Sequence, residues 1–128
     1  MVKKNPLSNP YKAIGTEKLF EMVDRFYYYV ERDDRINYLF PGDFKETAFK
    51  QKLFQVQFLG GPNLYIQEYG HPMMKARHMP FVITPYAKDA WLENMYQAML
   101  DVDIPEELRD FLFQRYTMTA NHMVNTPD

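Results

Sequence analysis

The chain has 128 residues, which is enough for one domain with a single hydrophobic core but too few for two. Its formal net charge is −2, and its 15 basic and 17 acidic residues are mixed along the sequence, which offers no basic patch for nucleic acid or an acidic membrane surface. Cysteine is absent, which excludes disulfides, iron–sulfur clusters, thiolate zinc sites and covalently attached c-type haem. No stretch approaches the roughly 20 apolar residues of a membrane span, so we expect a cytoplasmic protein.

Aromatic residues are frequent, at 16% of the chain with ten Phe and ten Tyr. Each large ring can bury roughly 150–250 Å². Either a flat cofactor or an aromatic protein core could use so many rings.

The first predicted helices lie near the N-terminus. Asparagine followed by proline is a good helix start, and it predicts a short helix at 10–14. After a glycine, Thr16 can cap a second helix with one buried face. Tyr27 lies on that face, whereas Tyr28 and Tyr29 fall off it. The apolar positions of the face are Leu19, Phe20, Val23, Phe26, Tyr27 and Val30.

A third helix is predicted to begin after Asp43, because Asp43 and Glu46 have the spacing of a capping box. It should run to Leu59 and stop at the Gly-Gly-Pro of 60–62. One inward stripe is Phe49, Leu53 and Val56, and the other is Thr47, Gln51, Phe54 and Phe58. A buried Gln without a hydrogen-bond partner costs about 1–3 kcal/mol. The second stripe is therefore either partly in contact with water or packed against a polar group.

The segment 60–86 is irregular and rich in proline, with room for a short helix only around Met73–His78, so we interpret it as a long binding loop. Thr84 and the following proline begin a fourth helix with Ala87, Trp91, Met95, Ala98 and Val102 on one face. A last helix opens after Ile104, with a stripe of Leu108, Phe111, Leu112, Arg115, Thr119 and His122. Convincing strand patterns and internal repeats are missing, so the predicted fold class is all-α.

Generic catalytic motifs are also missing, which directs attention to the three histidines. His71 precedes a proline, which biases His71 toward extended backbone and favours a histidine in a surface turn. His122 falls on an inward stripe, which favours a hydrogen-bonded histidine at the edge of the core. His78 ends the short helical stretch in the loop. The pattern of the residues does not decide among the three.

Many spaced matches, in the right order, resemble the group II truncated haemoglobins over nearly the whole chain. They are Ala13-Ile14-Gly15, Phe26-Tyr27, Phe40-Pro41, Glu46-Thr47-Ala48, Lys50-Gln51-Lys52, Leu59-Gly60-Gly61-Pro62, Leu64-Tyr65, Gly70-His71-Pro72-Met73, Ala76-Arg77-His78, Pro80-Phe81, Ala90-Trp91 and His122-Met123-Val124-Asn125.

The resemblance implies a two-over-two helical sandwich around a non-covalent haem b, with His78 as the proximal iron ligand. The expected organisation is a flexible segment at 1–9, the truncated globin domain at 10–125 and a tail at 126–128. On the distal side, the resemblance implies Tyr27 and Trp91 as hydrogen-bond donors to bound dioxygen, with Gln51 and Thr47 lining the same pocket. A run of three tyrosines allows a register error of one residue, but periodicity favours Tyr27.

The remaining haem contacts are expected from two groups of side chains. Phe40 resembles the aromatic residue that wedges against the haem edge, and an apolar wall is expected from Phe54, Phe81 and Met95. Cations or donors for the haem propionates are expected from Arg77, Lys50 and Tyr65.

Three functions are carried forward. The first is reversible dioxygen binding for transport or sensing. The second is a haem enzyme with peroxidase or nitric oxide dioxygenase activity, and the third is a haem-free helical interaction domain.

The expected partners are dioxygen and other small haem ligands, namely nitric oxide, carbon monoxide, peroxide and sulfide, together with a separate reductase. Nucleic acid and membrane are not expected as partners, and the chain is expected to be a monomer or a homodimer.

Overall fold

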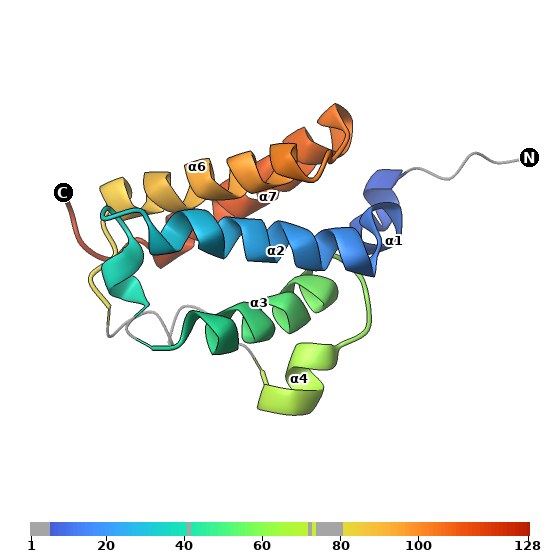
Figure 1. Cartoon of the computed structure of the whole chain (residues 1–128), viewed down its shortest axis with the longest axis horizontal. Helices are drawn as coiled ribbons and strands as arrows, with labels where there is room; N and C mark the ends of the chain where they lie inside the picture. Colours follow the sequence, from blue (N-terminus) through green and yellow to red (C-terminus); the bar gives the residue numbers. More distant parts are fainter. Residues whose placement is uncertain (1–5, 41, 72, 74–80) are drawn as a thin grey trace, which may run out of the picture.

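The computed structural model describes residues 6–40, 42–71, 73 and 81–128, and these residues contain helices but no strand. Figure 1 shows their arrangement. The 3-10 helices are η1 (Pro6–Ser8) and η2 (Asn37–Leu39), and the α-helices are α1 (Pro10–Ile14), α2 (Thr16–Glu31), α3 (Phe44–Phe58), α4 (Leu64–Tyr69), α6 (Pro85–Asp101) and α7 (Glu106–Met123). The predicted all-α class is confirmed.

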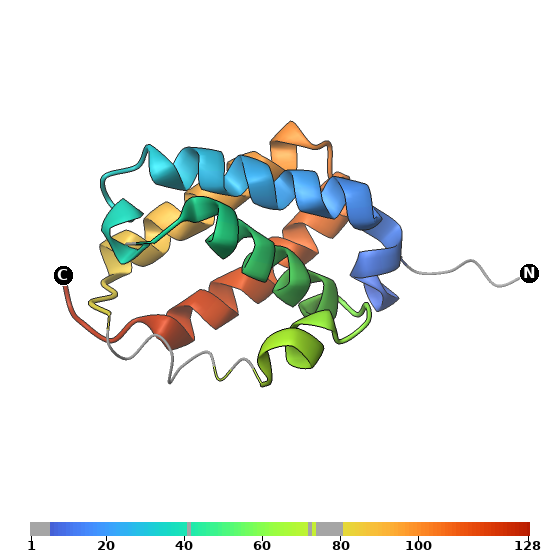
Figure 2. The same ribbon diagram turned by 60° about the horizontal axis from the view of Figure 1, so that its bottom comes forward.

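The four long helices form two stacked pairs. α2 packs against both α3 and α6, and α6 packs against α7. In Figure 2 the pair α2 and α3 lies over the pair α6 and α7, with α7 passing diagonally behind α3. The short helix α4 packs against α3. This is the two-over-two sandwich that the resemblance implied.

Side-chain caps explain where three of the helices begin. Asn9 accepts from the Lys12 backbone N–H at 3.1 Å, Asp43 from Lys45 at 2.9 Å and Thr84 from Ala87 at 3.1 Å. Each acceptor satisfies one of the free N–H groups of the first helical turn. The predicted starts of α1, α3 and α6 are therefore confirmed.

The predicted cap of α2 is wrong. Thr16 is the first residue of the helix, and Gly15, with φ +87°, occupies the cap position without a side-chain bond. The Thr16 hydroxyl instead lies 2.6 Å from the Tyr11 hydroxyl, which ties α1 to α2. Glu46 does not complete a capping box either, since it pairs with Lys50 at 3.5 Å.

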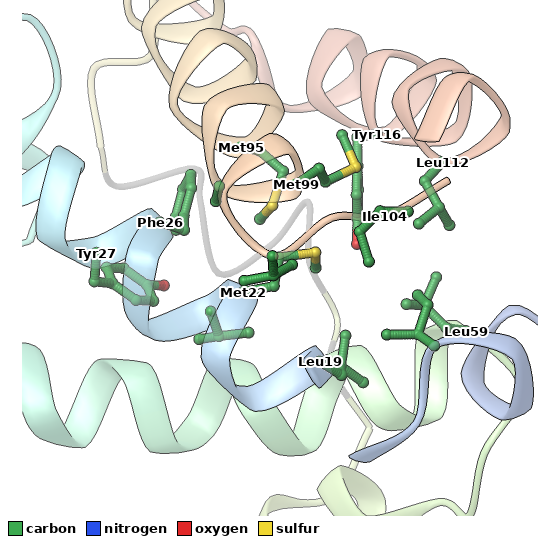
Figure 3. Packing of buried hydrophobic residues seen from close by; sticks show 14 of the residues in the cluster. Leu19, Met22, Phe26, Tyr27, Leu59, Met95, Met99, Ile104, Leu112 and Tyr116 are labelled. Carbon is green, nitrogen blue, oxygen red and sulfur yellow. The ribbon is translucent and has the colours of Figure 1, made fainter. Parts of the chain in front are cut away.

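The hydrophobic core lies where α2, α6 and α7 meet. Figure 3 shows their side chains converging from the three helices. Leu19, Met22, Phe26 and Val30 of α2 are fully buried, as the predicted apolar face requires. Burial of each such side chain contributes about 1.5–3 kcal/mol to stability. This face of α2 therefore stabilises the packing of the pair α2 and α3 on the pair α6 and α7.

Several sequence predictions about this fold need correction. The segment 60–86 contains α4, which was not predicted because six residues are too few for a helical period. Phe49 is 52% exposed, so the first inward stripe of α3 is wrong at that position. His122 is exposed rather than at the core edge. The predicted helix around Met73–His78 lies outside the described residues except for Met73, which is exposed and has φ +45°.

Local structure and hydrogen bonds are also present near both ends of the domain. Residues 6–8 form η1, within the segment expected to be flexible. Near the C-terminus, the Asn125 side chain accepts from the Ile83 backbone N–H at 3.0 Å and donates to the Phe81 carbonyl at 2.8 Å. The expected tail joins this contact, because the Thr126 N–H donates to the Ile83 carbonyl at 3.1 Å. These bonds hold the chain that leads into α6.

The turn after α3 depends on a close approach at Gly61. A Cβ atom there would lie 2.8 Å from side-chain atoms of Tyr11 and Val56. Only glycine fits there without a shift of one of these side chains.

Among the described helices, none is long and apolar enough to cross a membrane.

Candidate functional site

A cavity of about 350 Å³ lies between the helix pairs, and we call it the central cavity. Its volume falls at the lower end of the range for cofactor sites. All but one of the predicted site residues that the structure describes line it. They are Tyr27, Phe40, Thr47, Lys50, Gln51, Phe54, Tyr65, Phe81 and Trp91.

Tyr27 reaches the cavity from the buried face of α2 and is only 7% exposed. Its ring packs edge-on against Phe40 and Phe44, with centroids 5.7 and 6.2 Å away. Burial raises the pKa of its phenol well above the usual value, so the hydroxyl remains protonated and can donate. That hydroxyl has no hydrogen-bond partner among the described residues. Tyr28, by contrast, is 44% exposed, which confirms the register predicted from periodicity.

Trp91 reaches the cavity from α6. Its ring packs against two others, with centroids 5.0 Å from Phe26 and 5.5 Å from Tyr116. The indole N–H can only donate, and in the part of the chain that the structure describes it has no acceptor. Two side chains that line the cavity therefore carry donors without a partner among the described residues.

The helix α3 supplies the polar wall of the cavity. Thr47 and Gln51 lie one turn apart there, which accounts for the mixed stripe noted in the sequence. Lys50 lies at the rim, where its side chain is 43% exposed and pairs with Glu46. At the far end of the helix, Phe54 packs edge-on against Tyr65 of α4, with centroids 5.8 Å apart.

Met95 was predicted to form part of the apolar wall, and its position in the structure differs. It is fully buried in the core next to α2, and it does not line the cavity (Figure 3). It shares the inward side of α6 with Trp91, but the inward side of a helix is broad enough to face both core and cavity. His78 and Arg77 lie outside the described residues.

A hydrogen-bonded pair on the cavity wall was not predicted from the sequence. The Tyr116 hydroxyl of α7 donates to the Gln55 side-chain carbonyl of α3 at 2.6 Å. Tyr116 is 2% exposed and Gln55 is 1% exposed, and both line the cavity. Lys88, also missed, lines the cavity and pairs with Asp89 at 3.5 Å. A single buried Gln has no sequence signal of its own; only the pairing of α3 with α7 reveals it.

A charged cluster joins the turn that follows α2 to α6. Arg35 donates to both carboxylate oxygens of Asp33, at 3.0 and 2.9 Å, and to Glu93 at 2.6 Å. Asn94 of α6 donates to Asp33 at 2.9 Å. The Arg35 guanidinium lowers the pKa of the Asp33 carboxyl to about 2, with a smaller contribution from the Asn94 amide. The cluster holds the two helices that carry Tyr27 and Trp91 in one relative position.

Comparison with known proteins identifies the family of this arrangement. The model of the bacterial-like globins matches residues 9–125. The chain belongs to the bacterial-like globin family. This globin is 53% identical over 116 residues to the group 2 truncated hemoglobin YjbI of Bacillus subtilis (strain 168), a match that covers 91% of the chain and 88% of that relative.

Solved structures agree with this assignment. The group II truncated hemoglobin from Bacillus anthracis has a TM-score of 0.92 to this globin at 50% identity, covering 98% of this chain and 96% of that one. The truncated oxygen-avid haemoglobin from Bacillus subtilis has a TM-score of 0.88 at 52% identity, covering 91% and 99%. The predicted resemblance to group II truncated haemoglobins is confirmed.

The globin family implies a haem, and the central cavity fits one. A haem needs apolar aromatic walls, donors or cations near its propionates, and an iron ligand. Phe40, Phe54 and Phe81 supply apolar surface, and Lys50 and Lys88 supply cations on the cavity wall. Among the described residues, no cluster of three or more His, Asp or Glu side chains could hold a bare metal ion.

Proposed function

We propose that this globin holds haem b in the central cavity through His78 and binds dioxygen reversibly. Of the three histidines, His71 and His122 are exposed, and neither lines the cavity. His78 falls in the segment between α4 and α6, both of which border the cavity. The family resemblance and this elimination both support His78 as the iron ligand.

The two unused donors are the observation that carries the proposal. When bound, the haem supplies an iron that takes dioxygen as a ligand and gives it partial negative charge. The Tyr27 hydroxyl and the Trp91 N–H have no acceptor among the described residues, so both can donate to such a ligand. Hydrogen bonds to a charged acceptor contribute about 1.5–3 kcal/mol each. Two such bonds to one ligand predict slow release.

The rim of the cavity supports the same proposal. Lys50 and Lys88 offer ammonium groups where a porphyrin edge would meet water, and we add Tyr65 and Arg77 as candidate propionate partners. Thr47 and Gln51 complete the polar side of the ligand pocket. A cytoplasmic location and a separate reductase, which would keep the iron ferrous, belong to the same proposal.

Absorption spectra of the purified protein test the proposal. We expect a Soret band and, in the ferrous protein, a reversible change in the visible bands when dioxygen is added. His78→Ala should remove the normal ferrous spectrum, whereas His122→Ala, at an exposed position, should keep it. A chain without a Soret band after haem is added would refute haem binding and favour an interaction domain.

A further inference from the structure

The Gln55–Tyr116 pair leaves part of its hydrogen-bonding capacity unused inside the molecule. The Tyr116 hydroxyl donates to the Gln55 carbonyl oxygen, but the Gln55 amide nitrogen has no partner among the described residues. In that part of the chain, Arg109 Nε is the one fully enclosed side-chain nitrogen or oxygen without a partner. Because the Gln55 amide nitrogen also has no partner but is not such an atom, it is not fully enclosed by protein. Since the residue is 1% exposed and lines the central cavity, its amide faces that cavity.

The chemistry of this surface does not depend on how the amide is oriented. As described, the pair presents an N–H donor of Gln55 and an oxygen lone pair of Tyr116. If the amide were flipped, it would present the Gln55 carbonyl as acceptor and the Tyr116 hydroxyl as donor. Either way, the cavity receives one donor and one acceptor side by side.

We infer that Gln55 and Tyr116 form a second ligand subsite, which holds a small neutral hydroxylic molecule such as water or hydrogen peroxide. Such a molecule both donates and accepts, so it satisfies both groups at once. A buried water usually makes two to four hydrogen bonds, and a polar cavity provides them. Dioxygen and carbon monoxide lack a donor, and burial disfavours an ion at this neutral pair.

The position of the subsite gives it a role near the distal donors. The Tyr116 ring lies against Trp91, with centroids 5.5 Å apart, and it stacks on Phe58 at 5.9 Å. A molecule held by the pair is therefore retained in the cavity beside a residue of the ligand pocket. Retention of water needs no haem, whereas retention of peroxide for reaction rests on the proposed function.

The first experiment detects water at the pair. In the ferrous carbon monoxide form, which is diamagnetic, we expect long-lived nuclear Overhauser contacts between water and the Gln55 side-chain amide protons. Tyr116→Phe keeps this amide but removes the neighbouring oxygen, so the contacts should weaken. Their absence from the wild-type protein would overturn the subsite, and the Soret band of the same sample reports haem binding separately.

The second experiment asks whether peroxide uses the subsite. The double variant Gln55→Leu/Tyr116→Phe removes all three polar atoms of the two side chains at similar volume. Thr117→Val is its control, since the Thr117 hydroxyl bonds the Phe113 carbonyl of its own helix. Loss of about one net hydrogen bond predicts a five- to tenfold slower reaction of the ferric double variant with hydrogen peroxide. Carbon monoxide association should stay within twofold. A slower reaction with peroxide, with carbon monoxide association unchanged, supports peroxide as a ligand of the subsite. An equal change in both rates, or no change in either rate, overturns peroxide as a ligand and leaves water as the occupant.

Discussion

Tyr27 and Tyr116 are both buried tyrosines on the cavity wall, and the same change should affect them in opposite ways. Burial raises the pKa of both phenols, so neither ionises near neutral pH. Their partners differ: the Tyr116 hydroxyl donates to Gln55 at 2.6 Å, whereas the Tyr27 hydroxyl has no partner among the described residues. Replacement by Phe therefore removes a structural bond in one case and a ligand donor in the other.

The expected magnitudes follow from these partners. Tyr116→Phe leaves the Gln55 carbonyl oxygen without its donor, which should cost about 1–3 kcal/mol of unfolding free energy. Tyr27→Phe removes a hydroxyl that has no partner among the described residues, so the free energy of unfolding should change by less than about 0.5 kcal/mol. For dioxygen dissociation the order reverses. Loss of a charge-assisted bond of about 1.5–3 kcal/mol predicts a rate about 10- to 150-fold higher in Tyr27→Phe, but little change in Tyr116→Phe.

Two assays separate these effects. Urea unfolding of the ligand-free ferrous protein gives the stabilities, and stopped-flow mixing with a dioxygen scavenger gives the dissociation rates. A Tyr27→Phe variant that is strongly destabilised yet releases dioxygen at the normal rate would refute the assignment of Tyr27 as a ligand donor. A Tyr116→Phe variant with unchanged stability would contradict the buried bond to Gln55.

Further predictions concern the rest of the site and its support. Trp91→Phe should also raise the dioxygen dissociation rate by about tenfold or more, and a normal rate would count against its N–H as a donor. The Asp33 pKa of about 2 lies below its ordinary value of 3.8, so the stability from its bonds to Arg35 is present above pH 4 and is lost toward pH 2. Asp33→Asn should cost about 1–2 kcal/mol at neutral pH and remove that part of the acid sensitivity, as measured by unfolding at several pH values. Gly61→Ala should destabilise by more than about 1 kcal/mol, because its Cβ would overlap two side chains, whereas Gly42→Ala, with open space around it, should not. Equal melting temperatures for the two glycine variants would contradict this packing.

Helical periodicity predicted the long elements because each has a strong local signal. Tyr27 could be placed on the buried face of α2 and distinguished from Tyr28, since one face of that helix is uniformly apolar. The caps Asp43 and Thr84 could also be predicted, because each depends only on residues next to it in the sequence. At Phe49 the same reasoning failed, because α3 carries aromatic residues on several sides and only its packing against α2 shows which side is exposed.

The site was less predictable because it depends on contacts between distant segments. Gln55 and Tyr116 are separated by 61 positions, and neither has a local signal for pairing. The short helix α4 is held by tertiary contacts, including the Gln57 side chain that accepts from the Ile66 N–H at 3.1 Å. Periodicity placed Met95 on an inward face but could not distinguish the core from the cavity. The choice of His78 came from the family resemblance and not from the residue pattern.

The most direct test of haem and dioxygen binding through His78 is the absorption spectrum of the ferrous protein. We predict a Soret band in the wild-type chain and a reversible spectral change on addition of dioxygen. We also predict that His78→Ala loses the normal spectrum, while the exposed His122→Ala keeps it. A wild-type chain that takes up no haem, or a His78→Ala variant with an unchanged ferrous spectrum and unchanged dioxygen binding, would contradict the account.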